Sequence, residues 1–234
     1  MALLLVLLSL ALTGCGAPGP KKVLESAIQW VKDDDCQAIG NGATSQSWWL
    51  YMKGGRTMTG LAGNLVIDGD TFYIRADASQ SSGEASVAPM WVRFSRQDVG
   101  DEETVEKAKD ILVGLVAASV SQPLLAMQTM TPDSQVAETS DGKAWVVTGK
   151  VTTLAQLELL FGKDAAKRYI EAGYEPDLER TVTVVVDKKT KRPLETTIAT
   201  ASVDPVFGKV SYSWLRGLWL PPDEDTVDLN KFLE

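Results

Sequence analysis

The sequence predicts an α+β domain: a curved antiparallel sheet with helices on one side. Three observations lead to this fold class. Apolar residues recur at helical spacing near the start of the chain and change to a period of two at Ser47. Two further stretches of helical character, residues 101–121 and 153–173, interrupt the strands. The last third then contains three strand-like runs, at residues 181–186, 194–201 and 207–215.

Composition and charge exclude several classes of function. The chain has 234 residues and a net charge of −8, which is opposite to the basic surface that duplex binding requires, so no nucleic-acid partner is expected. It contains no histidine, which removes His-based triads, His general bases and His metal ligands. Nucleophile elbows, P-loops and dinucleotide fingerprints do not occur in it. We therefore expect no enzyme, no cofactor and no metal site.

The N-terminus predicts a lipid-anchored protein. Residues 3–12 form an apolar run interrupted only by Ser9, too short to span a bilayer but typical of a signal-peptide core. Leu12-Thr13-Gly14-Cys15 follows and resembles the lipobox of bacterial lipoproteins. Residues 1–14 are therefore predicted to be a signal peptide, although Met1-Ala2 supplies no basic residue and indicates a start site upstream.

Acylation of Cys15 would attach the mature chain to the extracytoplasmic face of the cell membrane. Two or more chains such as palmitate suffice for stable anchoring, since each buried CH₂ contributes about 0.8 kcal/mol. Residues 15–20 then form the lipidated cysteine and a short tether, and residues 21–234 a single domain. Cys36 follows three aspartates, which would raise the pKa of a thiol, and is interpreted as a small structural residue.

The first half of the domain is predicted to contain a helix and several strands. Residues 21–32 form the helix, and Ser47 starts an aromatic-rich strand that Gly54-Gly55 turns back. Asp68-Gly69 lies between two apolar runs and predicts a tight hairpin, because glycine accepts positive φ. A further strand is expected at residues 91–94.

Two helical regions are expected in the middle of the chain. Residues 101–121 begin with acidic residues, become apolar around the whole circumference, and should stop at Pro123. An apolar stretch of this kind must be covered on several sides. The second region starts with a capping box at Thr153 and Gln156, breaks at Gly162 and ends at Gly173.

The order of these elements resembles the LppX/LprAFG-like family of bacterial envelope lipoproteins. The resemblance rests on the lipobox, the first helix and the mid-chain helix. It also rests on the strands at residues 69–75 and 91–94, the run from Asp141 to Val151, the strand at 183–187 and the C-terminal stretch 221–229. It implies a LolA-like fold, that is, a strongly bent antiparallel sheet or half-barrel with helices packed on its concave side. It also implies a cavity for a multi-acylated lipid or glycolipid, and no catalytic residues.

Two functions follow as alternatives. The first is a membrane-anchored protein that binds, and transfers across the cell envelope, a lipid whose chains would otherwise meet water; an envelope transporter is a possible partner. The second is a protein–protein adaptor or sensor with the same fold and an interior filled by its own side chains. For the first function, six residues are predicted to line the apolar space: Leu112, Leu115, Val116, Leu157, Leu160 and Phe161.

Overall fold

The computed structural model describes most of the predicted domain and none of the N-terminal segment before residue 18. The described residues are 18–33, 37–41, 47–53, 56–61, 65–76, 90–98, 102–109, 112–113, 116, 122–174, 176–200, 208–215 and 223–232. The predicted signal peptide, Cys15 and Cys36 therefore lie outside them.

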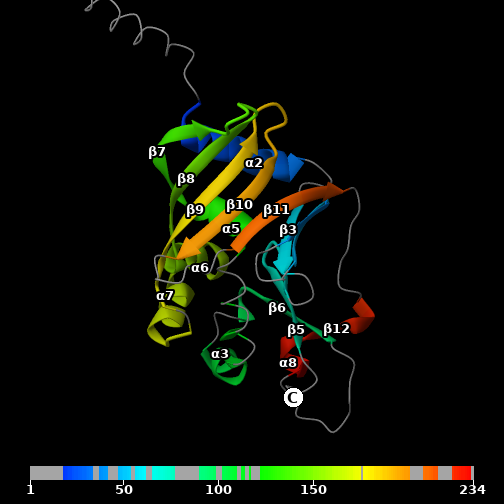
Figure 1. The fold of residues 1–234 in the computed structure, drawn as a ribbon. Coiled ribbons are helices and arrows are strands. Elements are labelled where there is room, and N and C mark those ends of the chain that lie inside the picture. The colour runs from blue at the N-terminus through cyan, green and yellow to red at the C-terminus, as the bar shows by residue number, and fades with distance from the viewer. Residues whose placement is uncertain are drawn as a thin grey trace, which may run out of the picture.

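Within these residues, twelve strands form one open sheet in the order β12-β6-β5-β4-β3-β2-β1-β11-β10-β9-β8-β7. Their bounds are β1 Gln37–Asn41, β2 Ser47–Lys53, β3 Arg56–Leu61, β4 Leu65–Asp68, β5 Thr71–Ala76, β6 Met90–Ser95, β7 Thr131–Glu138, β8 Ala144–Thr152, β9 Glu179–Asp187, β10 Pro193–Thr200, β11 Gly208–Leu215 and β12 Thr226–Asp228. The sheet bends strongly and stays open, which confirms the predicted half-barrel (Figure 1).

The helices are short and lie to one side of the bent sheet. They are α2 Pro20–Asp33, α3 Glu102–Lys107, α5 Pro123–Thr129, α6 Thr153–Phe161, α7 Lys163–Glu171 and α8 Leu229–Phe232, and Asp223–Asp225 form a single 3₁₀ turn, η3. Figure 1 shows α2 behind the upper ends of β7–β10, and α6, α7 and α3 together at the lower end. The prediction of helices on the concave side is confirmed.

Helix α2 forms where the apolar spacing predicts it and packs with one face. Val23, Leu24, Ala27 and Val31 are all at most 4% exposed, whereas Lys21 and Lys22 face solvent. These four residues share one side because positions three and four apart on a helix are neighbours. They join side chains of α5, β8 and β9 in an apolar group that we call the α2 cluster.

The β4–β5 hairpin also forms as predicted, with its loop one residue further along. Asp68 pairs with Thr71, so the two loop residues are Gly69 and Asp70 rather than Asp68 and Gly69. Gly69 has a φ of 60°, in the left-handed region that favours glycine. The hairpin therefore depends on a backbone conformation that β-branched residues disfavour.

The helix pair α6–α7 confirms the predicted break and corrects the predicted cap. Gly162 separates the two helices with a φ of 86°. The N-cap is Thr152, whose hydroxyl accepts a hydrogen bond from the amide of Ala155 at 3.1 Å. Thr153 lies inside the helix and its hydroxyl bonds to residues of β9 and the preceding segment, so the Thr153–Gln156 capping box was wrong.

The predicted helix at residues 101–121 is described only in part. Helix α3 covers Glu102–Lys107, and Lys109, Leu112, Val113 and Val116 are helical among the described residues that follow, whereas the predicted end of the helix at residues 117–121 lies outside them. Gln122 is extended, so no helix continues through Pro123, which begins α5, where its fixed φ suits the first turn and its missing amide hydrogen leaves no bond unmade. Val113 is 38% exposed, so the apolar stretch is not covered on every side.

The C-terminal segment closes one edge of the sheet in a way the sequence did not predict. β12 pairs with β6 in parallel, whereas every other described pairing is antiparallel. The turn of helix α8 follows at once. Residues 226–232, which we call the C-terminal strap, thus lie beside a strand more than 130 positions earlier in the chain (Figure 1).

We expect Gly69→Val to lower the thermal melting temperature. Its Cβ would meet nothing within 4 Å, so the cost arises from backbone strain of about 1–3 kcal/mol rather than from a clash. Gly69→Asn is the control, because asparagine tolerates positive φ and should melt closer to the parent protein. Equal melting temperatures for the valine variant and the parent would contradict this turn.

Candidate functional site

The lower half of the molecule encloses one continuous apolar group, which we call the central cluster. It joins β4, β5 and β6 on the sheet side to the chain after α3, to α5, and to α6 and α7 on the helix side, with α8 at one end. Its buried members are Ile67, Phe72, Val92, Phe94, Ala108, Leu112, Val116, Leu125, Leu157, Leu160, Phe161, Ala165, Ala166, Tyr169 and Leu229.

Five of the six predicted ligand-lining residues meet in this cluster. Leu112, Val116 and Leu157 are fully buried, and Leu160 and Phe161 are at most 7% exposed. Leu115 lies outside the described residues. Within the described residues, the two helical regions therefore pack into one apolar cluster, and a role of these side chains in ligand binding stays a prediction.

Aromatic rings fill part of the central cluster. Phe72 stacks on Phe94 with ring centres 5.6 Å apart and meets Phe161 at 5.4 Å. Phe161 in turn contacts Tyr169, at 5.3 Å. Burial raises the pKa of Tyr169 above its ordinary value, so its hydroxyl stays protonated at neutral pH. The rings link β5 and β6 to α6 and α7 by side-chain packing alone.

A buried polar group supports the start of α6. Arg180 of β9 is 7% exposed and donates hydrogen bonds to Gln156 Oε1 and to Thr153 Oγ1. Thr153 also accepts a bond from the amide of Leu178. Moving the first turn of α6 away from β9 would break these hydrogen bonds and leave buried polar atoms without partners. Because that is costly, the group holds this turn against β9. The α6–α7 pair is therefore attached to the upper sheet by this buried group at one end. At the other end it packs on the rings and accepts one exposed hydrogen bond, from Arg96 to the carbonyl of Leu159.

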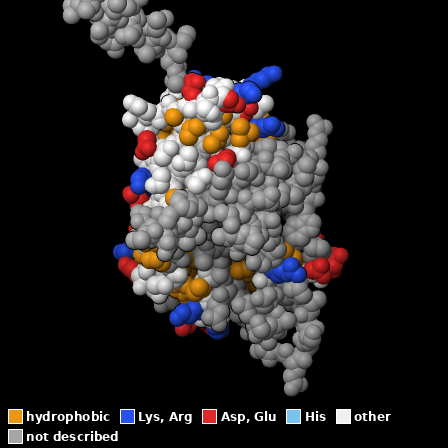
Figure 2. Space-filling model, in the orientation of Figure 1, with side chains coloured by type: hydrophobic (Ala, Val, Ile, Leu, Met, Phe, Trp, Pro, Cys, Tyr) orange, Lys and Arg blue, Asp and Glu red, His pale blue; other side chains and the backbone are white. Residues whose placement is uncertain are grey.

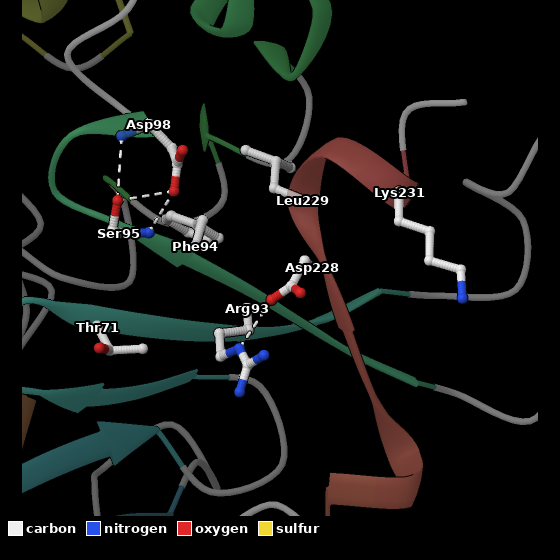
Figure 3. A pocket seen from close by; sticks show the side chains of 8 residues that line it. All are labelled: Thr71, Arg93, Phe94, Ser95, Asp98, Asp228, Leu229 and Lys231. Atoms are coloured by element: carbon white, nitrogen blue, oxygen red, sulfur yellow. Dashed lines mark hydrogen bonds and ion pairs between the residues drawn. The ribbon is translucent and has the colours of Figure 1, made fainter.

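The structure also contains a polar pocket that sequence reasoning missed. It has a volume of about 520 Å³ and lies where the C-terminal strap ends against β6. Figure 3 shows its walls, which come from β5, β6, the turn after β6, β12 and α8. The lining residues are Thr71, Arg93, Phe94, Ser95, Asp98, Asp228, Leu229 and Lys231. We call it the sheet-edge pocket.

An ion pair stands at the centre of this pocket. Arg93 and Asp228 are opposite each other in the β6–β12 register, and Arg93 Nε donates to Asp228 Oδ1 at 2.8 Å (Figure 3). This hydrogen bond and the charge of Arg93 lower the pKa of Asp228, and Lys231 contributes in the same direction. Reciprocally, Asp228 raises the pKa of Arg93. Both side chains are about half exposed or more, so the pair is weak and breakable.

A second carboxylate closes the other side of the pocket. Asp98 Oδ2 accepts hydrogen bonds from the amide of Ser95 at 2.7 Å and from its hydroxyl at 2.8 Å. The first of these bonds gives the backbone amide of Ser95 a partner, two residues after Arg93, the last residue of β6 that pairs with β12. The edge of β6 is thus capped by a turn rather than by another strand.

The pocket adjoins the central cluster through two residues. Phe94 and Leu229 line the pocket and also belong to the cluster, at 3% and 2% exposure. Val92 and Phe94 point to the buried face of β6, whereas Arg93 between them points to the other face, because side chains alternate along a strand. The sheet-edge pocket therefore has walls on both faces of the sheet, and its inner wall is the cluster itself.

The described residues contain neither a metal-binding cluster nor a membrane-spanning helix. The described residues contain no group of three or more Cys, Asp or Glu side chains placed to hold a metal ion. Every helix in the described part of the chain is too short or too polar to cross a bilayer. The acidic residues Asp223, Glu224 and Asp225 form the 3₁₀ turn η3 and are exposed to solvent.

The site thus belongs to an open α+β half-barrel whose helices and sheet enclose an apolar interior. Among solved structures, the chain is similar to a LolA superfamily protein from Nitrosomonas europaea, at 10% identity and a TM-score of 0.32. The match covers 89% of this chain and 97% of the other. A search of protein-family models and of curated proteins gives no match. At this low TM-score the fold class rests on the strands and helices described above.

Removing Arg93 should restore an ordinary titration to Asp228. In the native chain, the Asp228 carboxylate stays charged below its ordinary pKa, so the pair persists at neutral pH and is lost only as the pH falls through that lowered pKa. In Arg93→Gln, a ¹³C NMR titration should show the pKa of Asp228 rising toward its ordinary value. Asp187, whose pKa is lowered by hydrogen bonds from Thr190, is the internal control and should not move.

Proposed function

We propose that this protein is a membrane-anchored lipoprotein that binds a multi-acylated lipid or glycolipid in the central cluster and passes it across the cell envelope. The observation that carries the proposal is the convergence of Leu112, Val116, Leu157, Leu160 and Phe161 on one apolar space between sheet and helices. The lipobox at Cys15 supports the anchor. The bent, open sheet supports an interior that ligand can enter without unfolding the upper half.

The way the helices are held supports entry of acyl chains. Helices α6 and α7 meet β5 and β6 mainly through rings and aliphatic side chains. Their buried polar attachment is at the far end, to Arg180, and one exposed hydrogen bond joins Arg96 after β6 to the carbonyl of Leu159 in α6. The break at Gly162, which has a φ of 86°, divides the covering layer into two short helices rather than one continuous helix. Inserting a chain would therefore replace contacts among side chains with contacts to lipid, at little cost in hydrogen bonds.

The adaptor or sensor is the second candidate, and the aromatic packing favours it. Phe72, Phe94, Phe161 and Tyr169 occupy the cluster with contacts of 5.3 to 5.6 Å between successive ring centres. A permanently filled interior would leave only the surface for function. The two candidates differ in one measurable respect, because a carrier purified from its own envelope retains lipid and an adaptor does not.

A larger side chain in the central cluster should reduce the amount of bound lipid, whereas a larger side chain in the α2 cluster should not. We expect native mass spectrometry of the envelope-purified protein to show lipid near one-to-one stoichiometry, and Leu160→Trp to reduce it. Val184→Phe in the α2 cluster is the matched control, since both changes overpack a buried site by about 1–3 kcal/mol. Parent protein without lipid, or equal loss of lipid in both variants, would reject the carrier.

Anchoring is tested at the two cysteines. Cys15→Ser should leave the protein in the aqueous phase of a detergent partition, because the acyl chains supply the membrane affinity. Cys36→Ser is the matched control and should remain in the detergent phase. The melting temperature of Cys15→Ser should equal that of the parent chain, since residues 15–20 are expected to be a tether. Detergent partition of Cys15→Ser would contradict the lipoprotein proposal.

A further inference from the structure

Consecutive residues of the C-terminal strap place a carboxylate and an aliphatic chain on opposite faces of the sheet edge. Asp228 pairs with Arg93 on the more exposed face. Leu229, the next residue, is 2% exposed in the central cluster beside helix and sheet side chains. Val227 and Phe232 pack against the same cluster. The strap thus offers the two parts of an anionic amphiphile, a charged head and an apolar tail, at one place.

The sheet-edge pocket is where a molecule with these two parts would cross the edge. Its volume of about 520 Å³ exceeds what a headgroup of a few atoms needs. Phe94 and Leu229 form its apolar side and lead to the cluster, while Arg93, Thr71 and Ser95 form its polar side (Figure 3). β12 pairs with β6 only as far as Arg93, and the pocket lies at the strand edge beyond that residue, between β6 and α8.

Charge favours an anion over a cation or a neutral head. Asp98 is engaged by the amide and hydroxyl of Ser95, and Asp228 by Arg93. Lys231 lines the same pocket, and its charge adds to the lowering of the Asp228 pKa after the hydrogen bond and the charge of Arg93. An anionic head that replaces Asp228 would therefore pair with Arg93, with Lys231 as a more distant cation, and the Asp228 carboxylate would move into water.

We propose that the sheet-edge pocket is the headgroup site for an anionic amphiphile, in which the head pairs with Arg93 and the chain enters the central cluster between Phe94 and Leu229. When no ligand is bound, the carboxylate of Asp228 occupies the position of the head beside Arg93, and the side chain of Leu229 occupies the position where the chain enters the central cluster. The inference rests on the proposed function, because it requires an apolar interior that takes up acyl chains. It adds the class of headgroup and the route of entry.

The displacement is within reach of ordinary binding energies. The strap is held by three parallel strand residues, one half-exposed ion pair and the packing of Leu229 and its neighbours. An exposed pair of this kind contributes at most a few-fold to an equilibrium constant. The anionic head of the ligand and the carboxylate of Asp228 then compete for the guanidinium of Arg93. Removing the charge of Asp228 should therefore strengthen ligand binding.

The test compares two probes with the same tail. Dansyl-labelled undecanoic acid and its primary amide differ only in headgroup charge, and both report binding by fluorescence. The protein is the full chain carrying Cys15→Ser, so that no acyl anchor requires detergent. The acid should bind more tightly than the amide. Arg93→Gln should weaken the acid about two- to fivefold and leave the amide within twofold, and Arg93→Lys should retain most of the preference.

The strap variants separate head from tail. Asp228→Asn should tighten the acid about two- to fivefold and leave the amide unchanged, whereas Leu229→Ala should tighten both probes. The control is the ion pair of Arg96 and Asp70, which has a separation of 3.0 Å and similar exposure and lies outside the pocket. Because Arg96 also donates to the carbonyl of Leu159 in α6, the pair is removed from the Asp70 side. Asp70→Asn should change neither affinity. Circular dichroism melts verify that each variant is folded.

The two proposals fail in different ways. Binding of both probes with equal affinity, unchanged in Arg93→Gln and Asp228→Asn, would overturn the headgroup site and leave the apolar carrier standing. Equal weakening of acid and amide in Arg93→Gln would overturn it too, because a structural role affects both probes alike. Failure of every variant and of the parent chain to bind either probe would reject the carrier together with the headgroup site.

Discussion

The positions of the helices and of the C-terminal strap depend on one constraint, which is that an open sheet must bury its apolar face and protect its two edges. Along β9, residues alternate between buried and partly exposed, so one face carries Val182, Val184 and Val186 into the α2 cluster. The hydrophobic effect then requires helices over that face, and short ones suffice because the sheet curves toward them. Two apolar groups result, one under α2 and one under α6 and α7.

The described surface and interior differ in how apolar residues are distributed. Figure 2 shows hydrophobic side chains on this face in separate groups, with charged side chains near them. Leu159 and Leu178 are exposed by 44% and 43%, whereas the central cluster gathers fifteen buried residues in one place. An apolar ligand would therefore gain most by entering the interior, and the edge at β6 is the point where polar and apolar walls meet.

Local signals in the sequence predicted much of the fold and half of the site. The spacing of Val23, Leu24 and Ala27 predicted α2, and glycine at position 69 predicted the hairpin, because both depend on neighbours within four residues. The same kind of reasoning misplaced the cap at Thr153, since a threonine suits several positions near the start of a helix and packing selects among them. Strand β7 and helix α5 carried no local signal strong enough to predict.

By itself, the sequence determined the class of the fold, the absence of histidine chemistry and the six apolar positions expected to converge, five of which are seen to meet. Periodicity suffices for these because it states which residues share a face. Only the tertiary structure decided that Arg93 faces Asp228 and that Leu229 closes the central cluster beside it. Arg93 and Asp228 are 135 residues apart and belong to strands that pair in parallel. Helical and strand periodicity relates only residues that are close in the sequence, so it cannot predict a pairing between two such distant strands.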